Sequence, residues 1–203
     1  MSFEVESNVQ GRASPTDTST STHGHGVLVS PEKLDRFLWR IEKEDKAWNM
    51  HHVEVPQLQF VVGYTGIHAA TGPLVAGVRK LVESDGEAKD AINRIGEIVL
   101  DGVEATRKRD KPKLGKLMGE NHELLNRLGV GHPSLEKLVR ACSEHSYGAK
   151  LTGAGGGRSM IALTDHAKEV VEAIRKAGGE ALEVSVGCEG VRIENRSVGP
   201  KRI

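Results

Sequence analysis

A glycine-rich segment, Lys150-Leu151-Thr152-Gly153-Ala154-Gly155-Gly156-Gly157, is the part of the sequence best suited to chemistry. It stands between two apolar stretches that favour β-strands. Each glycine in such a place costs about 0.5–1 kcal/mol of backbone entropy relative to alanine, whereas a plain hairpin needs only two turn residues with one glycine. Successive N–H groups in a turn of this kind form an anion-binding concavity. The pattern therefore predicts a ligand-contacting loop, with an unadorned hairpin turn as the alternative.

A second segment places one carboxylate among hydroxyls and turn formers. It reads Gly11-Arg12-Ala13-Ser14-Pro15-Thr16-Asp17-Thr18 and continues as Ser-Thr-Ser-Thr-His-Gly. This density of Ser, Thr, Gly and Pro predicts a loop held by hydrogen bonds from side chains to backbone. Taken alone, Asp17 is expected to cap a helix or an Asx-turn. A catalytic role for its carboxylate is the alternative.

The elements that would position these segments follow from periodicity. Strands are predicted at Gly26–Ser30 and Leu58–Tyr64, and an amphipathic helix from about Glu32 to Asp45. Helical spacing then runs through residues 71–84, 88–109, 111–129 and 132–145. The glycine segment reads as strand, loop and strand. A helix capped by Asp165 and stopped at Gly178 leads to a last strand beginning at Glu180. This order predicts an α+β fold with helices over one face of an antiparallel sheet.

The composition of the chain argues against several classes of partner. The 28 basic and 28 acidic residues cancel, which indicates no nucleic acid partner. No apolar run is long enough to cross a bilayer, and the first residues lack a secretory signal pattern, so no membrane association and a cytoplasmic location are expected. Cys142 and Cys188 match no metal spacing and are expected to be buried, reduced thiols. The histidines, including the adjacent pair His51-His52, are expected to be solvated or capping rather than zinc ligands.

Four stretches together give a resemblance. Lys150-Leu151-Thr152-Gly-Ala-Gly-Gly-Gly with the apolar strand after it resembles a glycine motif of the GHMP kinase superfamily. The Ser-Pro-Thr-Asp-Thr-Ser-Thr stretch at Ser14, VVGYTGIHAATGPLVAGV at Val61 and MGENHELLNRLGVGHPSLEKLV at Met118 resemble its mevalonate-phosphorylating branch. The resemblance spans about residues 5–193. Arg158 and Ser159 depart from it, because the family usually has glycine and a small residue or cysteine there. Gly72 also stands where a lysine is common.

The resemblance implies a fold, an activity and a set of residues. Residues 57–203 would form the family's ferredoxin-like C-terminal domain, and residues 1–56 would be the tail of a ribosomal-S5-like N-terminal domain. The implied reaction is ATP-dependent phosphorylation of mevalonate to 5-phosphomevalonate, with Mg²⁺. Asp17 would be the catalytic carboxylate. The implied substrate or phosphate contacts are Ser14, Thr18, Thr152, Gly153, Ala154, Gly155 and Gly156.

One part of the family pattern is not found. GHMP kinases bind ATP through a loop of the form Pro-x3-Gly-Leu-Gly-Ser-Ser-Ala at a helix N-terminus, and no such loop precedes Asp17. The Mg²⁺ ligands and a lysine expected from the family are absent with it. A truncated sequence or misplaced start is therefore expected. The alternatives are a non-catalytic subunit of a split kinase and a kinase for phosphomevalonate or homoserine. A homodimer or a missing N-terminal half is the expected macromolecular partner.

Overall fold

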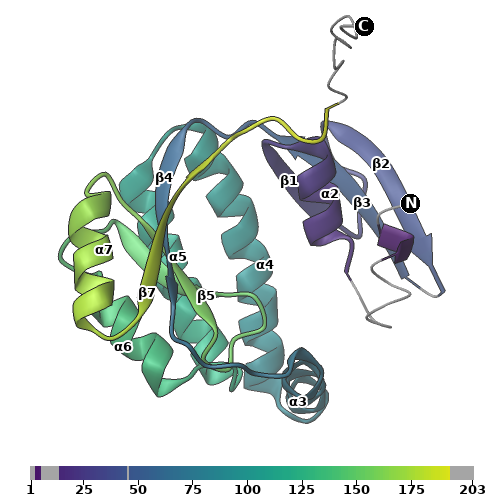
Figure 1. Cartoon of the computed structure of the whole chain (residues 1–203). Coiled ribbons are helices and arrows are strands. Elements are labelled where there is room, and N and C mark those ends of the chain that lie inside the picture. The colour runs from purple at the N-terminus through teal and green to yellow at the C-terminus, as the bar shows by residue number, and fades with distance from the viewer. Residues whose placement is uncertain (1–2, 6–13, 45, 193–203) are drawn as a thin grey trace, which may run out of the picture. The chain divides into compact units, whose positions relative to one another are not determined.

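The computed structural model describes residues 3–5, 14–44 and 46–192 (Figure 1). Contacts divide the chain into two units, residues 1–55 with 187–203 and residues 56–186. In the described residues, no helix has the length and apolar character needed to cross a membrane.

The first unit is built on a three-stranded antiparallel sheet. Its strands are β1 (Gly26–Ser30), β2 (Phe37–Lys43) and β3 (Lys46–Val53), in the order β1-β3-β2. Helix α2 (Thr16–His23) packs against β1. The central strand β3 carries the buried side chains of Asn49, Met50, His51 and Val53, and Phe3, Pro15 and Ser19 are buried elsewhere in this unit.

Two sequence predictions in this unit are wrong. The helix expected over residues 32–45 is the strand β2, in which Phe37, Trp39 and Ile41 alternate with other residues and have high β-propensity. The loop expected over residues 11–26 is helical from Thr16 to His23, and its residues 11–13 lie outside the described part. The predicted side-chain-to-backbone bonds do occur, but within α2: the Thr20 hydroxyl donates to the carbonyl four residues earlier, 2.8 Å away, and Thr22 does likewise.

The second unit contains a four-stranded sheet and five helices among its described residues. In chain order they are β4 (Leu58–Tyr64), α3 (Thr71–Ser84), α4 (Gly86–Arg107), α5 (Lys111–Arg127), α6 (Pro133–Ala141), β5 (Gly148–Thr152), β6 (Ser159–Leu163), α7 (Ala167–Lys176) and β7 (Glu180–Val186). The strand order is β5-β6-β4-β7, antiparallel at every pairing. This is the ferredoxin-like arrangement, and the predicted α+β fold is confirmed.

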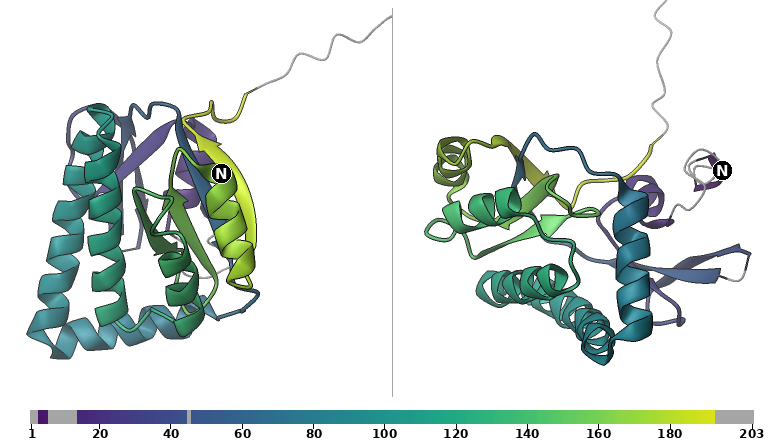
Figure 2. Two further views of the ribbon diagram at one scale, coloured as in Figure 1. Left: turned by 90° about the vertical axis from the view of Figure 1, so that its left-hand side faces the viewer. Right: turned by 90° about the horizontal axis from the view of Figure 1, so that it is seen from below.

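The core of this unit lies between one sheet face and the helices. Val61, Leu151, Met160 and Ala162 alternate with less buried neighbours and point into this layer. The helices α6 and α7 supply its other side through Leu135, Leu138, Val170 and Ile174. A second cluster joins α4 to α5, which lie side by side in Figure 2, and is formed by Ala88, Ala91, Ile98, Ala105, Leu117, Leu124 and Leu128.

Helix α5 lies against the edge strand β5 at backbone distance. A Cβ added to Gly115 would stand 2.1 Å from the carbonyl oxygen of Tyr147, and one added to Gly148 would stand 2.0 Å from the carbonyl oxygen of Gly115. Only glycine allows this approach. The helix thereby covers the edge of the sheet, whose unpaired backbone groups would otherwise be open to another chain.

Two further predictions need correction. Asp165 does not cap α7, because the helix begins at Ala167 and the hydroxyl of Thr164 accepts the free N–H of His166 at 2.7 Å. The Asp165 carboxylate instead accepts hydrogen bonds from Lys111 and Tyr147. Of the two cysteines, Cys142 is buried as expected, and burial raises the pKa of its thiol to about 11. Cys188 is exposed.

The close approach at Gly115 gives a direct test. Gly115→Ala should lower the free energy of unfolding by about 1–3 kcal/mol or more, because the added methyl group meets backbone that cannot move aside. Gly119→Ala on the same helix is the matched control, since no atom lies within 4 Å of its added Cβ. It should stabilise the chain by about 0.5–1 kcal/mol. Urea unfolding measures both, and equal effects would contradict the close packing.

Candidate glycine loop and Asp17 site

The glycine segment forms the connection between β5 and β6. Backbone φ is positive at Gly153 (72°), Gly155 (81°), Gly156 (70°) and Gly157 (106°). Other L-residues rarely adopt this region. The run of glycines is therefore required by the backbone path of the loop itself.

Most of these glycines are also required by close packing. An added Cβ would stand 2.2 Å from the carbonyl oxygen of Val130 at Gly155, 2.8 Å from Ala69 at Gly156, and 2.9 Å from Ile67 at Gly157. Gly153 differs, because no atom lies within 4 Å of its added Cβ and the residue is exposed. The loop thus presents the Gly153 end to solvent and holds the other end against the protein.

Three hydrogen bonds fix the buried end of the loop. The Gly156 N–H donates to the carbonyl oxygen of Val130 at 2.8 Å. The Thr65 hydroxyl donates to the carbonyl oxygen of Gly157, and the Thr65 N–H donates to that of Arg158 at 3.0 Å. The loop is therefore a pre-formed structure rather than a loose hairpin turn.

Arg158, which departs from the family pattern, extends from the loop to helix α3. Its Nη1 lies 3.3 Å from the hydroxyl oxygen of Thr71, the first residue of α3. The residue before it, Ala70, makes no side-chain cap, and the first turn of α3 has no acidic residue. A guanidinium at the positive end of a helix leaves two positive groups together, which is favourable to an anion.

His122 holds the start of the loop and was not singled out from the sequence. Its Nδ1 accepts the Leu151 N–H at 3.2 Å, so its proton is on Nε2, which donates to Glu136 at 2.7 Å. Asn126 donates to the same carboxylate oxygen at 2.7 Å. Leu151 belongs to the edge strand, so its N–H has no strand partner on that side. The local sequence around His122 does not indicate this contact.

Ser14, Asp17 and Thr18 lie at or just before the start of α2 in the first unit. Ser14 Oγ lies 3.0 Å from the hydroxyl oxygen of Thr16, and the Thr18 hydroxyl donates to the Pro15 carbonyl oxygen at 3.4 Å. Asp17 is in the first turn of α2, where the helix dipole favours a negative charge. Its carboxylate is exposed and, within residues 14–44 and 46–192, accepts no hydrogen bond.

The predicted site residues therefore form two groups. Thr152, Gly153, Ala154, Gly155 and Gly156 share the loop of one unit, and Ser14, Asp17 and Thr18 share the start of α2 in the other. In the part of the chain that is described, no three His, Cys, Asp or Glu side chains are placed to hold a metal ion. The expectation that the histidines are solvated or capping is wrong for the buried His51, bonded to Leu34 and Leu28, and for the buried His122, whereas His132 does cap α6.

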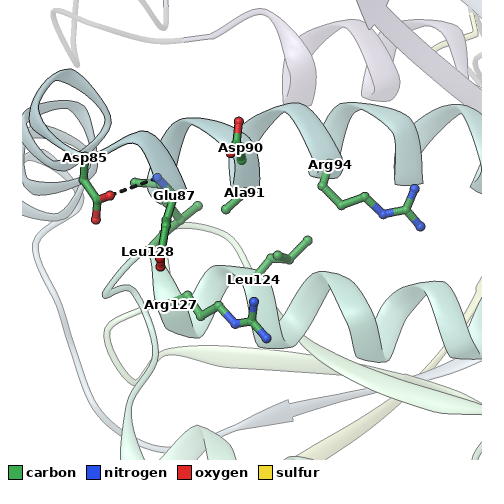
Figure 3. Close-up of a pocket in the computed structure, with 9 residues that line it drawn as sticks. Asp85, Glu87, Asp90, Ala91, Arg94, Leu124, Arg127 and Leu128 are labelled. Carbon is green, nitrogen blue, oxygen red and sulfur yellow. Dashed lines mark hydrogen bonds between the residues drawn. The ribbon is translucent and has the colours of Figure 1, made fainter.

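A pocket of about 530 Å³ lies apart from the loop, between α4 and α5 (Figure 3). Its apolar wall is Ala88, Ala91, Leu124 and Leu128, which are members of the α4–α5 core cluster. Arg94 and Arg127 lie at its charged side, and Arg94 is bound to Glu120 at 2.7 Å. The hollow is thus the outer surface of a helix pair and contains none of the predicted site residues.

Comparisons with known proteins place the loop in a family context. Residues 103–180 match the model of the family described as GHMP kinases C terminal. The mevalonate kinase of Thermococcus sibiricus is 38% identical over 96% of this chain and 56% of its own length. That of Homo sapiens is 31% identical over 99% of this chain and 50% of its own. The chain thus spans about half the length of the curated relatives it matches.

A solved structure shows the same fold over most of the chain. The Methanococcus jannaschii mevalonate kinase matches with a TM-score of 0.67 and 26% identity over 92% of this chain and 54% of its own. The structure of L. major mevalonate kinase in complex with R-mevalonate gives a TM-score of 0.67 and 26% identity, covering 73% of this chain and 48% of its own.

The His122 contact can be tested without a ligand. His122→Leu leaves the Leu151 N–H without its acceptor and the Glu136 carboxylate with Asn126 as its donor, and should cost about 2–4 kcal/mol of unfolding free energy. His122→Asn keeps an acceptor where Nδ1 stands and should cost clearly less. Urea unfolding and amide exchange at Leu151 report the difference. Equal losses in the two variants would show that volume, and not the hydrogen bond, is what His122 supplies.

Proposed function

Because this chain belongs to the GHMP kinases and contains their C-terminal domain, we propose that it supplies the substrate-side groups of an ATP-dependent mevalonate kinase. The observation that carries the proposal is the anchored glycine loop, whose Gly153 end is open and whose exit bears the Arg158 guanidinium. The chain covers 56% of the Thermococcus sibiricus relative. The activity of a complete enzyme is therefore part of the proposal.

Phosphoryl transfer needs positioning and charge stabilisation more than covalent chemistry. The loop from Thr152 to Gly155 offers backbone N–H groups in a fixed turn, whereas the Gly156 N–H is already bonded to Val130, and Arg158 offers a bidentate cation beside the loop. These groups suit the oxygens of a phosphate or of the mevalonate carboxylate. Binding there would hold the substrate without reorganising the loop, since its buried end is already bonded to Val130 and Thr65.

Asp17 is the proposed base. Its exposed carboxylate accepts no hydrogen bond from the described residues. It is therefore available to accept the proton of a substrate hydroxyl. Ser14 and Thr18 flank it and are proposed as hydroxyl contacts to the substrate. The first turn of α2 holds Asp17 and Thr18 in a fixed relation, and Ser14 lies two residues before the helix begins.

The phosphoryl donor is ATP in this proposal. Among the described residues, no three His, Cys, Asp or Glu side chains are placed together to hold its magnesium ion. What this chain supplies is the loop, the arginine and the carboxylate.

An assay with parallel substrates tests the proposal. The purified chain is mixed with the N-terminal half of the Thermococcus sibiricus relative, and ADP release is measured with Mg-ATP and mevalonate, homoserine or phosphomevalonate. Turnover with mevalonate, greater than with the other two, is expected. Preference for another substrate would reassign it, and no turnover with any of them would favour a non-catalytic role. The chain without the added half shows whether that half is needed.

The role of Asp17 has a separate test in the same assay. Asp17→Asn should lower turnover by roughly 10²–10⁴-fold, the usual contribution of a positioned acid or base, with the unfolding midpoint little changed because the side chain is exposed. Asp35→Asn, an exposed carboxylate of the same unit, is the control and should keep full turnover. Near-normal turnover of Asp17→Asn would remove Asp17 from the reaction.

A further inference from the structure

Three histidines and a glutamate gather in the first unit, and the proposed reaction uses none of them. His23 ends helix α2, His52 lies in β3, and Glu54 follows that strand. His23 Nε2 is 2.8 Å from His52 Nδ1, and His52 Nε2 is 3.1 Å from a carboxylate oxygen of Glu54. The rings of His23 and His25 stand 5.1 Å and 5.7 Å from that of His52.

The partners fix where the protons lie. A carboxylate only accepts, so His52 donates from Nε2 to Glu54 and, when neutral, has a lone pair on Nδ1. His23 must then donate from Nε2 to His52 Nδ1. The result is a directed chain of two hydrogen bonds from the last turn of α2 to Glu54.

The hydrogen-bonded pair His23–His52 can hold only a limited number of protons. One additional proton can add to His23 Nδ1 and leave the bond from His23 Nε2 to His52 Nδ1 in place, or it can add to His52 Nδ1 if that bond reverses. A second proton places an N–H on both facing nitrogens, which then repel each other and cannot bond. Complete protonation therefore separates His23 from His52.

We propose that His23, His52 and Glu54 are positioning residues for α2, and that full protonation of the two histidines releases the end of this helix. Asp17 lies six residues before His23 in the same helix, about 9 Å along its axis at 1.5 Å per residue. A shift at one end therefore moves the other. The consequence for catalysis rests on the proposed role of Asp17, whereas the positioning of α2 does not.

The groups around the pair give the pH direction. Burial, then His52 and His25, hold the pKa of His23 below its usual value, so the folded unit favours the neutral ring. A histidine whose pKa is depressed in the folded state destabilises the fold at low pH. The stability is therefore fully present above the ordinary histidine range and is lost as the pH falls through it. Glu54 acts in the opposite sense. The hydrogen bond with His52 is the largest cause that lowers the pKa of Glu54, and Arg36 lowers it further. The release is thus expected at a pH below the ordinary histidine range.

A backbone clamp holds the same end of α2 and sets the background of the test. The Val191 N–H donates to the Thr22 carbonyl oxygen at 3.2 Å, and the His25 N–H donates to that of Cys188 at 2.7 Å. These bonds do not titrate. The helix is therefore expected to shift, and not to unfold, when the histidine chain opens.

Nuclear magnetic resonance of the whole chain follows both events. Ring ¹⁵N shifts of His23 and His52 and backbone amides of Thr18–Thr22 are recorded from pH 8 to 4.5. Ring protons on Nε2 of both histidines at pH 8 are expected, and the helix amides should shift with the same midpoint as the rings. Glu54→Gln should move that midpoint to lower pH by roughly 0.5–1 unit, because a carboxylate that favours the charged pair is lost.

Substitutions at His52 separate positioning from packing. His52→Asn keeps an acceptor at the Nδ1 position and does not titrate, so α2 should keep its pH 8 shifts down to acid pH. His52→Leu removes the acceptor and should displace the α2 amides at every pH. His145→Gln, in the other unit, is the control and should change nothing. Helix amides that titrate alike in wild type and His52→Asn would overturn the proposal.

Kinase turnover in the reconstituted assay adds the link to function. With mevalonate and Mg-ATP, turnover should fall with the midpoint of the α2 amides, and His52→Asn should remove that acid limb. An acid limb unchanged by His52→Asn would overturn the link from α2 to Asp17. If no variant turns over while the amides behave as expected, the proposed reaction fails and the positioning of α2 stands.

Discussion

The second unit depends on how its edge strand is covered. Strand β5 has a free side, and helix α5 meets it at backbone contact distance through Gly115 and Gly148. His122 from the same helix then bonds the Leu151 N–H that no strand reaches. The edge is satisfied by a helix and a side chain in place of another strand. Since Leu151 is followed directly by the glycine loop, the geometry of the loop follows from this packing.

Most of the glycines in the loop are required by packing within the protein and not by contact with a ligand. Three of its glycines are small because Val130, Ala69 and Ile67 stand behind them. Only the Gly153 end is open. In the proposed substrate site, binding energy would then be available for substrate contacts, because the backbone has been ordered in advance by hydrogen bonds within the protein.

Sequence periodicity predicted several elements well. The bounds of β1 in the first unit and of β4 and α3 in the second match the apolar runs and the glycine and proline residues beside them, because local propensity agrees with the fold there. It failed at β2, where Phe37, Trp39 and Ile41 owe their conformation to pairing with β3, and at α2, whose Thr-rich helix is bonded through its own hydroxyls. His122 and His52 could not be assigned, since their partners lie at Leu151 and His23, far away in sequence.

The strand order has a consequence for synthesis. The central strand β4 comes first in its unit but pairs with β6 and β7, so Leu58 faces Val186 across the sheet. The helix pair α4–α5 joins neighbouring segments and is available as soon as it leaves the ribosome. The strand β4 must wait for more than a hundred further residues before its outer neighbour arrives. Until then its apolar side chains lack the strands and the helix α7 that pack against them in the folded unit.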